Sequence, residues 1–267
     1  MNTFEYLRPS ALAEVLQLLQ DDPEAKLLAG GQSLLAAMKL RFAAPTKLID
    51  LQGLPALRSL HLDGDALWIG AMCSHAQVAA STLVRQSVPM LAALAGGIGD
   101  QQVRNRGTLG GSIANADPAA CWPAGVLALN GTVCTDRREI AADDFFQGLF
   151  TTALESDEVV VGVRFPRTPS AHYRKFEQAA SRFALTGVAV AQCTQGVRVA
   201  VTGLGNGVTR WREAEEVLSR QWSPEALDGL HFDETQATGD VHASAEYRAH
   251  LALVLTRSAV QHLLQTA

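Results

Sequence analysis

Two pairs of adjacent glycines, Gly30-Gly31 and Gly110-Gly111, constrain the fold of this chain more than any other feature of its sequence. The first pair follows a short apolar run at residues 26–29, typical of a strand, and precedes a helical pattern that begins at Leu34. Glycine lets the backbone turn sharply and approach a ligand, and amides at a helix start attract anions. Ala29 to Leu34, the first glycine loop, is therefore a candidate phosphate site; a plain strand-to-helix turn is the alternative.

The second pair lies in the second glycine segment, Thr108 to Asp117, which also carries Ser112 and Asn115. Such a segment offers backbone donors and a small polar set, or else it is a rigid Asx-type turn. Neither pair matches G-x-x-x-x-G-K-[ST] or G-x-G-x-x-G, which disfavours a P-loop NTPase and a Rossmann dehydrogenase. Two separate phosphate-capable loops suggest an extended ligand, such as a dinucleotide, that is clamped from both sides.

Hydrophobic periodicity predicts the elements around these loops. Ser10 is the expected N-cap of a helix that ends at Pro23 and carries Leu12, Val15, Leu16 and Leu19 on one face. A hairpin is expected around Asp63-Gly64-Asp65. Further helices are predicted over 34–40, 75–81, 88–96, 123–129, 214–220 and 243–264, and strands over 47–51, 133–140, 158–165, 184–192 and 197–204. The stretch from 96 to 120 is rich in Gly, Asn and Asp and is interpreted as a long structured loop.

Composition and charge exclude several function classes. With 48% hydrophobic and 18% charged residues, the 267-residue chain is expected to be globular, and its net charge of −5 argues against nucleic-acid binding. The N-terminal sequence does not look like a signal peptide, and no apolar run is long enough to span a membrane, so a cytoplasmic location is expected. The four cysteines show no metal-ligand spacing, so neither a metal ion nor an iron–sulfur cluster is expected.

Four stretches of the chain carry a resemblance to a known family. They are LLAGGQSLLAAMKLRFAAPTKLIDL, IGAMCSHAQV, QVRNRGTLGGSIANADPAA and DVHASAEYRAHLALVLTRSAV. In this order, and over essentially the whole length, the sequence resembles the FAD-binding medium subunit of molybdenum hydroxylases, the group of carbon monoxide dehydrogenase and xanthine dehydrogenase.

The resemblance implies an α+β protein with the vanillyl-alcohol-oxidase-type FAD-binding fold. Two α/β subdomains, residues 1–56 and 57–168, would hold FAD. A C-terminal domain, residues 169–267, would contain a small antiparallel sheet with helices. The boundary falls where Pro166 to Ser170 interrupts the pattern.

The resemblance also implies which residues contact FAD. The first glycine loop would bind the pyrophosphate and Thr108 to Ser112 the other side of the cofactor. Phe183 falls where some members carry an aromatic residue near the isoalloxazine ring. The predicted cofactor-binding residues are Leu28, Ala29, Gly30, Gly31, Gln32, Ser33, Leu34, Ile98, Thr108, Gly110, Gly111, Ser112, Ala114, Asp117, Val160 and Lys175. No catalytic acid or base is predicted.

The sequence departs from the family pattern at two positions near the second glycine segment. Many relatives have Asn where this chain has Ser112, and an FAD-contacting Asp where it has Cys121. Asp117 is a candidate replacement for that carboxylate, and Cys121 is interpreted as a buried small residue. His75 is interpreted as a packed histidine, with covalent flavin attachment as the alternative. Arg104 and Arg106 either contact FAD phosphate or a partner, or are solvated.

The implied function is electron transfer within a complex. FAD would accept electrons from the two [2Fe-2S] clusters of a small partner subunit and pass them to a terminal acceptor, while a molybdopterin-containing large subunit oxidises the substrate. Two alternatives from other classes remain: a flavin-free structural or assembly subunit that keeps the fold, and a stand-alone flavin oxidase.

Overall fold

The N-terminal region of the computed structural model, which describes residues 1–266, is a small three-stranded parallel sheet with two helices. The strand order is β1-β3-β2, and β3 pairs with both neighbours in parallel. Its elements are β1 (Glu5–Leu7), α1 (Leu12–Asp21), β2 (Lys26–Leu28), α2 (Leu34–Lys39), β3 (Lys47–Asp50) and the 3-10 helices η1 (Leu51–Gly53) and η2 (Pro55–Arg58). The first glycine loop joins β2 to α2.

Helix α1 packs its apolar face as the periodicity predicts, with Val15 and Leu19 buried. The predicted cap is wrong: the N-cap is Ala11, and no side chain caps the helix. Ser10 lies one residue too early, and its backbone amide donates to the Glu14 carboxylate at 3.4 Å instead.

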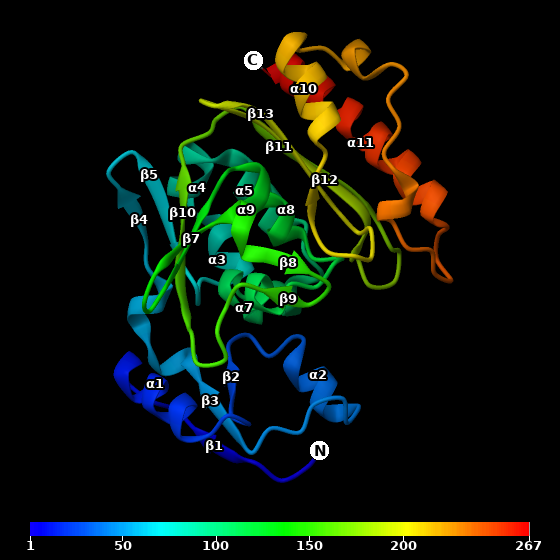
Figure 1. The fold of residues 1–267 in the computed structure, drawn as a ribbon. Helices are drawn as coiled ribbons and strands as arrows, with labels where there is room; N and C mark the ends of the chain where they lie inside the picture. Colours follow the sequence, from blue (N-terminus) through cyan, green and yellow to red (C-terminus); the bar gives the residue numbers. More distant parts are fainter. Residues whose placement is uncertain (267) are drawn as a thin grey trace.

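The central region is a five-stranded antiparallel sheet, ordered β4-β5-β10-β6-β7, that packs against a group of helices (Figure 1). The predicted hairpin is confirmed as β4 and β5. Strand β10 returns from the end of this region to the middle of the sheet, which ties the region together. The bounds are β4 (Leu60–Asp63), β5 (Ala66–Gly70), α3 (His75–Ala80), α4 (Thr82–Ser87), α5 (Pro89–Gly96), α6 (Gln101–Arg106), α7 (Leu109–Asn115), α8 (Cys121–Ala128), β6 (Thr132–Thr135), β7 (Glu139–Ala141), α9 (Ala142–Phe145), β8 (Phe146–Gly148), β9 (Thr151–Thr152) and β10 (Val160–Pro166).

Two sequence predictions for this region are wrong. The stretch 96–120 is not a long loop, because it folds into α6 and α7, capped by Asp100 and Thr108. The single strand predicted over 133–140 is a hairpin of β6 and β7. Elements of three to seven residues are too short to reveal their period in the sequence.

The charge run of Glu155, Asp157 and Glu158 is most simply interpreted from the sequence as a solvated turn, and this interpretation is wrong only for Glu158. Glu155 is exposed and Asp157 is partly exposed, but Glu158 is only 5% exposed. Its carboxylate accepts hydrogen bonds from the Arg138 guanidinium at 2.7 and 2.8 Å and from the Thr135 hydroxyl at 2.7 Å. These charge-assisted bonds hold the pKa of Glu158 low, at about 2, and fix the segment that leads into β10.

The C-terminal region is a four-stranded antiparallel sheet, β11-β12-β13-β14, between helices (Figure 1). Helices α10 and α11 pack on one side, and α8 of the central region contacts β12 and β13. Strand β12 is buried over most of its length, which explains its continuous apolar run. The bounds are β11 (Ala171–Glu177), β12 (Ala184–Cys193), β13 (Gly196–Thr202), β14 (Thr209–Arg210), α10 (Arg212–Arg220), η3 (Pro224–Leu227), η4 (Glu234–Gln236) and α11 (Ala245–Thr266). Among the described helices, none is long and apolar enough to cross a membrane.

Candidate cofactor site

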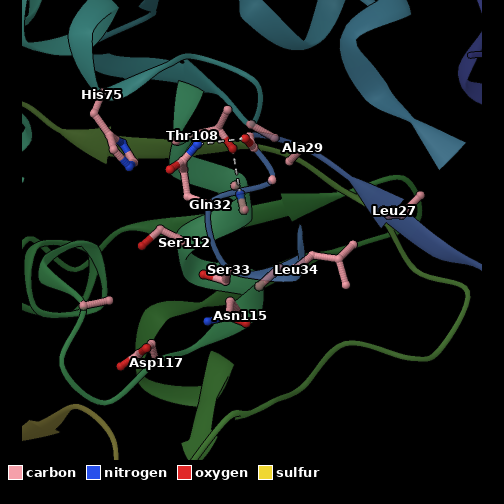
Figure 2. A pocket seen from close by; sticks show the side chains of 18 of the residues that line it. Leu27, Ala29, Gln32, Ser33, Leu34, His75, Thr108, Ser112, Asn115 and Asp117 are labelled. Carbon is pink, nitrogen blue, oxygen red and sulfur yellow. Dashed lines mark hydrogen bonds between the residues drawn. The ribbon is translucent and has the colours of Figure 1, made fainter. Parts of the chain in front are cut away.

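A cavity of about 490 Å³ lies where the three regions meet. Its volume is in the range that protein pockets use for small-molecule ligands. Figure 2 shows Ser33 of the first glycine loop with Ser112, Asn115 and Asp117 of the second glycine segment around the same space. The C-terminal region contributes the segment from Ser181 to Phe183.

The structure brings most of the sequence-predicted site residues together. Fourteen of the sixteen line the cavity: Ala29, Gly30, Gly31, Gln32, Ser33, Leu34, Ile98, Thr108, Gly110, Gly111, Ser112, Ala114, Asp117 and Val160. Leu28 and Lys175 do not. The Leu28 side chain is buried in a small cluster with Met38 and Leu48. The Lys175 ammonium instead donates to the carbonyls of Gly97 and Arg182.

The glycines allow close packing around the two predicted loops, which meet where a Cβ on Gly111 would lie 3.3 Å from the Cβ of Ala29. A Cβ on Gly30 would lie 2.2 Å from the carbonyl oxygen of Arg106, and one on Gly110 would lie 2.6 Å from the Cβ of Ala71. Gly31 has a φ of 74°, in the left-handed region that favours glycine. Close backbone packing therefore accounts for the need for glycine at these positions as well as the approach of a ligand does.

The first glycine loop presents a run of free amides. Within residues 1–266, the N–H groups of residues 30–34 donate to no backbone or side-chain acceptor. The first bonded amide is that of Leu35, which donates to the Gly31 carbonyl at 3.2 Å. Unpaired amides that line a cavity require a ligand or water as acceptor. This loop therefore has the chemistry expected of a pyrophosphate site.

The second glycine segment does not offer the backbone donors that its sequence suggests. The amide of Gly110 donates to Ala71 O at 2.8 Å, and those of Gly111 and Ser112 donate to Thr108 Oγ1 and O, both at 3.1 Å. The segment is the first turn of α7, so its amides are already used. The glycines of this segment leave room for a ligand, and its side chains supply polar groups. Within the described chain, the Ser112 hydroxyl and the Asn115 carboxamide have no hydrogen-bond partner. Asn115 was noted in the sequence but not predicted as a site residue.

His75 lines the cavity but is held by packing. It is 5% exposed, and its Nδ1 accepts a hydrogen bond from the Trp122 indole at 3.0 Å. Burial, with a smaller effect of the nearby Arg104 charge, lowers the pKa of His75 to about 4. These contacts match the packed histidine expected from the sequence; no sequence signal placed it at the cavity.

Cys121 begins α8 at the cavity wall and is buried. Burial raises the pKa of its thiol, so position 121 supplies no negative charge. The nearest carboxylate of the second glycine segment is Asp117, whose Oδ1 accepts from the Ala119 amide at 2.8 Å. Its second oxygen has no hydrogen-bond partner in the described chain, and its replacement of the family carboxylate stays a prediction.

Comparison with known proteins decides the family. Residues 2–168 match the model of the FAD binding domain in molybdopterin dehydrogenase, and residues 171–263 match the CO dehydrogenase flavoprotein C-terminal domain. The chain belongs to this family. It is an oxidoreductase subunit with FAD as its cofactor, of the medium-subunit type found in molybdenum hydroxylases.

Relatives match over nearly their whole length. The nicotine 6-hydroxylase medium subunit of Paenarthrobacter nicotinovorans is 38% identical over 96% of this chain and 95% of its own. The carbon monoxide dehydrogenase medium chain of Hydrogenophaga pseudoflava is 34% identical, over 96% of each chain. Among solved structures, CO dehydrogenase from Oligotropha carboxidovorans superimposes with a TM-score of 0.92 at 29% identity, covering 100% of this chain and 99% of the other.

Proposed function

We propose that this chain is the electron-transfer subunit between the two [2Fe-2S] clusters of a small partner subunit and a terminal acceptor. A molybdopterin-containing large subunit would oxidise the substrate. The observation that carries this proposal is the run of free amides in the first glycine loop, on a cavity that both glycine elements share. It supports retention of FAD, which a subunit of this kind requires.

The site residues have distinct proposed roles. The amides of residues 30–34 bind the FAD pyrophosphate. Ser112, Asn115 and Asp117 bind polar groups from the opposite wall, and Ile98 and Val160 supply apolar contacts. Leu28 and Lys175, which do not line the cavity, act by supporting its wall. FAD, when bound, supplies the redox chemistry, because a flavin accepts electrons singly and releases them in pairs.

The proposed architecture is the vanillyl-alcohol-oxidase-type FAD-binding fold, with subdomains 1–56 and 57–168 and a C-terminal domain 169–267. The three larger sheets follow one another along the chain, which supports this division. A cytoplasmic location stays a prediction from the sequence.

The two alternative functions make different demands on the cavity. A flavin-free structural subunit has no need of five unpaired amides facing a cavity, so their retention weighs against it. A stand-alone oxidase needs an acid–base group beside its substrate. His75 is a poor one, because it is buried, bonded to Trp122 and neutral above pH 4.

Purification of the native complex tests the proposal. We expect this chain to co-purify with two partners and to carry about one FAD, while iron is found in the small subunit and molybdenum in the large one. Separation of the subunits followed by flavin and metal analysis of each gives the answer. A chain that assembles with both partners but carries no flavin would establish the structural alternative instead.

A further inference from the structure

A turn at the cavity edge has its carbonyls held by two cations. The Lys175 ammonium, on β11, donates to the carbonyl of Gly97 at 2.7 Å. The Arg104 guanidinium, on α6, donates to the carbonyls of Ile98 at 3.0 Å and Gly99 at 2.8 Å. Three successive peptide carbonyls are thus bound by positive charges from two different elements.

This arrangement fixes the direction of the amides that follow. In a trans peptide the N–H of one residue points opposite to the carbonyl of the residue before it, and the described chain contains no cis peptide bond. With the carbonyls of Ile98 and Gly99 turned toward Arg104, the amides of Gly99 and Asp100 point away from it. Within residues 1–266, neither amide donates to a protein acceptor.

The turn borders the cavity through Gly99, and Asp100, which follows it, lies next to the lining. Ile98, Gly99 and Val103 line the cavity, whereas Arg104 and Lys175 do not. Lys175 also donates to the carbonyl of Arg182 at 2.6 Å, and Arg182 and Phe183 line the same cavity. One side chain therefore joins the turn to the C-terminal wall.

We propose that the amides of Gly99 and Asp100 form a second donor site, which binds carbonyl acceptors on the pyrimidine edge of the isoalloxazine ring, and that Arg104 and Lys175 are its positioning residues. This inference rests on FAD binding by the cavity. The first glycine loop serves the phosphates, and the apolar Ile98, Val103 and Phe183 beside the turn suit a flat ring. Arg104 aligns the two peptide dipoles directly, and Lys175 fixes the preceding peptide of the turn. Aligned amides favour negative charge, so the site holds reduced flavin more tightly than oxidised flavin.

The substitutions Arg104→Gln and Lys175→Met test this in the full chain. We expect each to raise the Kd for oxidised FAD about tenfold, and that for reduced FAD tenfold more, which lowers the two-electron midpoint potential by about 30 mV. The matched control is Arg85→Gln. Arg85 donates to the carbonyls of Ala79 and Ala80 at 2.9 and 2.8 Å in the same manner, but these two residues do not line the cavity, unlike Ile98 and Gly99. The Kd for FAD in either redox state should therefore stay unchanged.

Amide hydrogen exchange is measured on the unsubstituted chain, so this second test does not require any variant to fold. FAD should slow exchange at Gly99 and Asp100 as well as at residues 30–34. Protection at residues 30–34 alone, or an unchanged midpoint potential in the folded Arg104→Gln chain, overturns the inference while FAD binding stands. No protection anywhere and no bound FAD overturns the proposed function, and this inference with it.

Discussion

The cavity depends on the close approach of Gly30 to the backbone of Arg106 and Gly107. A Cβ at Gly30 would meet the backbone of Arg106 and Gly107, which has no flexible side-chain end to move aside. We expect Gly30→Ala to lower the free energy of unfolding by about 1–3 kcal/mol, as overpacked sites do, and to weaken FAD binding.

Gly96→Ala is the matched control for that substitution. Its nearest neighbour would be the Cβ of Ala79 at 3.7 Å, an ordinary contact, so its effect should stay within about 0.5 kcal/mol. Urea unfolding of both variants measures the difference. Equal midpoints would show that the close approach at Gly30 is not needed.

His75 predicts a loss of stability on acidification. In the unfolded chain its pKa is about 6.5, and in the folded chain burial lowers it to about 4. The unfolded state therefore binds the extra proton between pH 6.5 and 4, and His75 contributes stability above pH 6.5 that is lost toward pH 4. The expected slope is roughly 1.4 kcal/mol per pH unit within that window, on the order of 3 kcal/mol in all.

The variant His75→Asn separates this effect from other titrations. Asn keeps an acceptor for the Trp122 indole but does not titrate, so the stability of the chain should fall less steeply below pH 6.5. The control His61→Asn replaces an exposed histidine and should leave the slope as it is. Unfolding curves measured at several pH values decide; an equally steep fall in His75→Asn would contradict the account.

Residue-level prediction succeeded where one local pattern sufficed. The strand-loop-helix pattern around Gly30-Gly31 placed the whole first glycine loop in the cavity wall, and only the preceding Leu28 lies outside it. His75 and Lys175 could not be assigned in this way, because their positions depend on packing against Trp122 and the Gly97 turn, both distant in sequence.

At the scale of elements, the N-cap residue of α7, Thr108, affects both the stability of the fold and the lining of the cavity. The Thr108 hydroxyl accepts from the Gly111 amide at 3.1 Å, and Ser81 caps α4 in the same way, accepting from Val84 at 3.3 Å. Thr108→Ala and Ser81→Ala should each cost about 1 kcal/mol of stability. Only Thr108→Ala should also weaken FAD binding, because Thr108 lines the cavity. Thermal unfolding and FAD titration of both variants check this; equal FAD affinities would place α7 outside the binding site.

The elements that the sequence failed to predict are short ones, which are defined by their N-cap residues or by the turn between two strands. Helices α6 and α7 have six and seven residues, and a Gly-rich composition conceals them. Their caps, Asp100 and Thr108, are the local signal that was available. The missed hairpin β6–β7 turns at residues 136–138, without the glycine or asparagine that usually marks such turns.

At the scale of the whole molecule, the cavity depends on all three regions together. The first glycine loop of the N-terminal region supplies the free amides, the helices of the central region supply the opposite wall, and the C-terminal region adds Phe183. The family resemblance implies that the first two subdomains hold FAD and that Phe183 lies near its ring, and these roles stay predictions. The unequal use of amides by the two glycine elements was not predictable, because it depends on the contact of α7 with β5 and Ala71.

Anaerobic reduction of the flavin tests the central claim most directly. The substrate of the complex is added either to the isolated FAD-loaded chain or to the assembled complex, and the flavin absorbance is followed. We predict bleaching only in the complex, because electrons reach this chain through its partners. Rapid bleaching in the isolated chain would contradict the account and identify a self-sufficient oxidase.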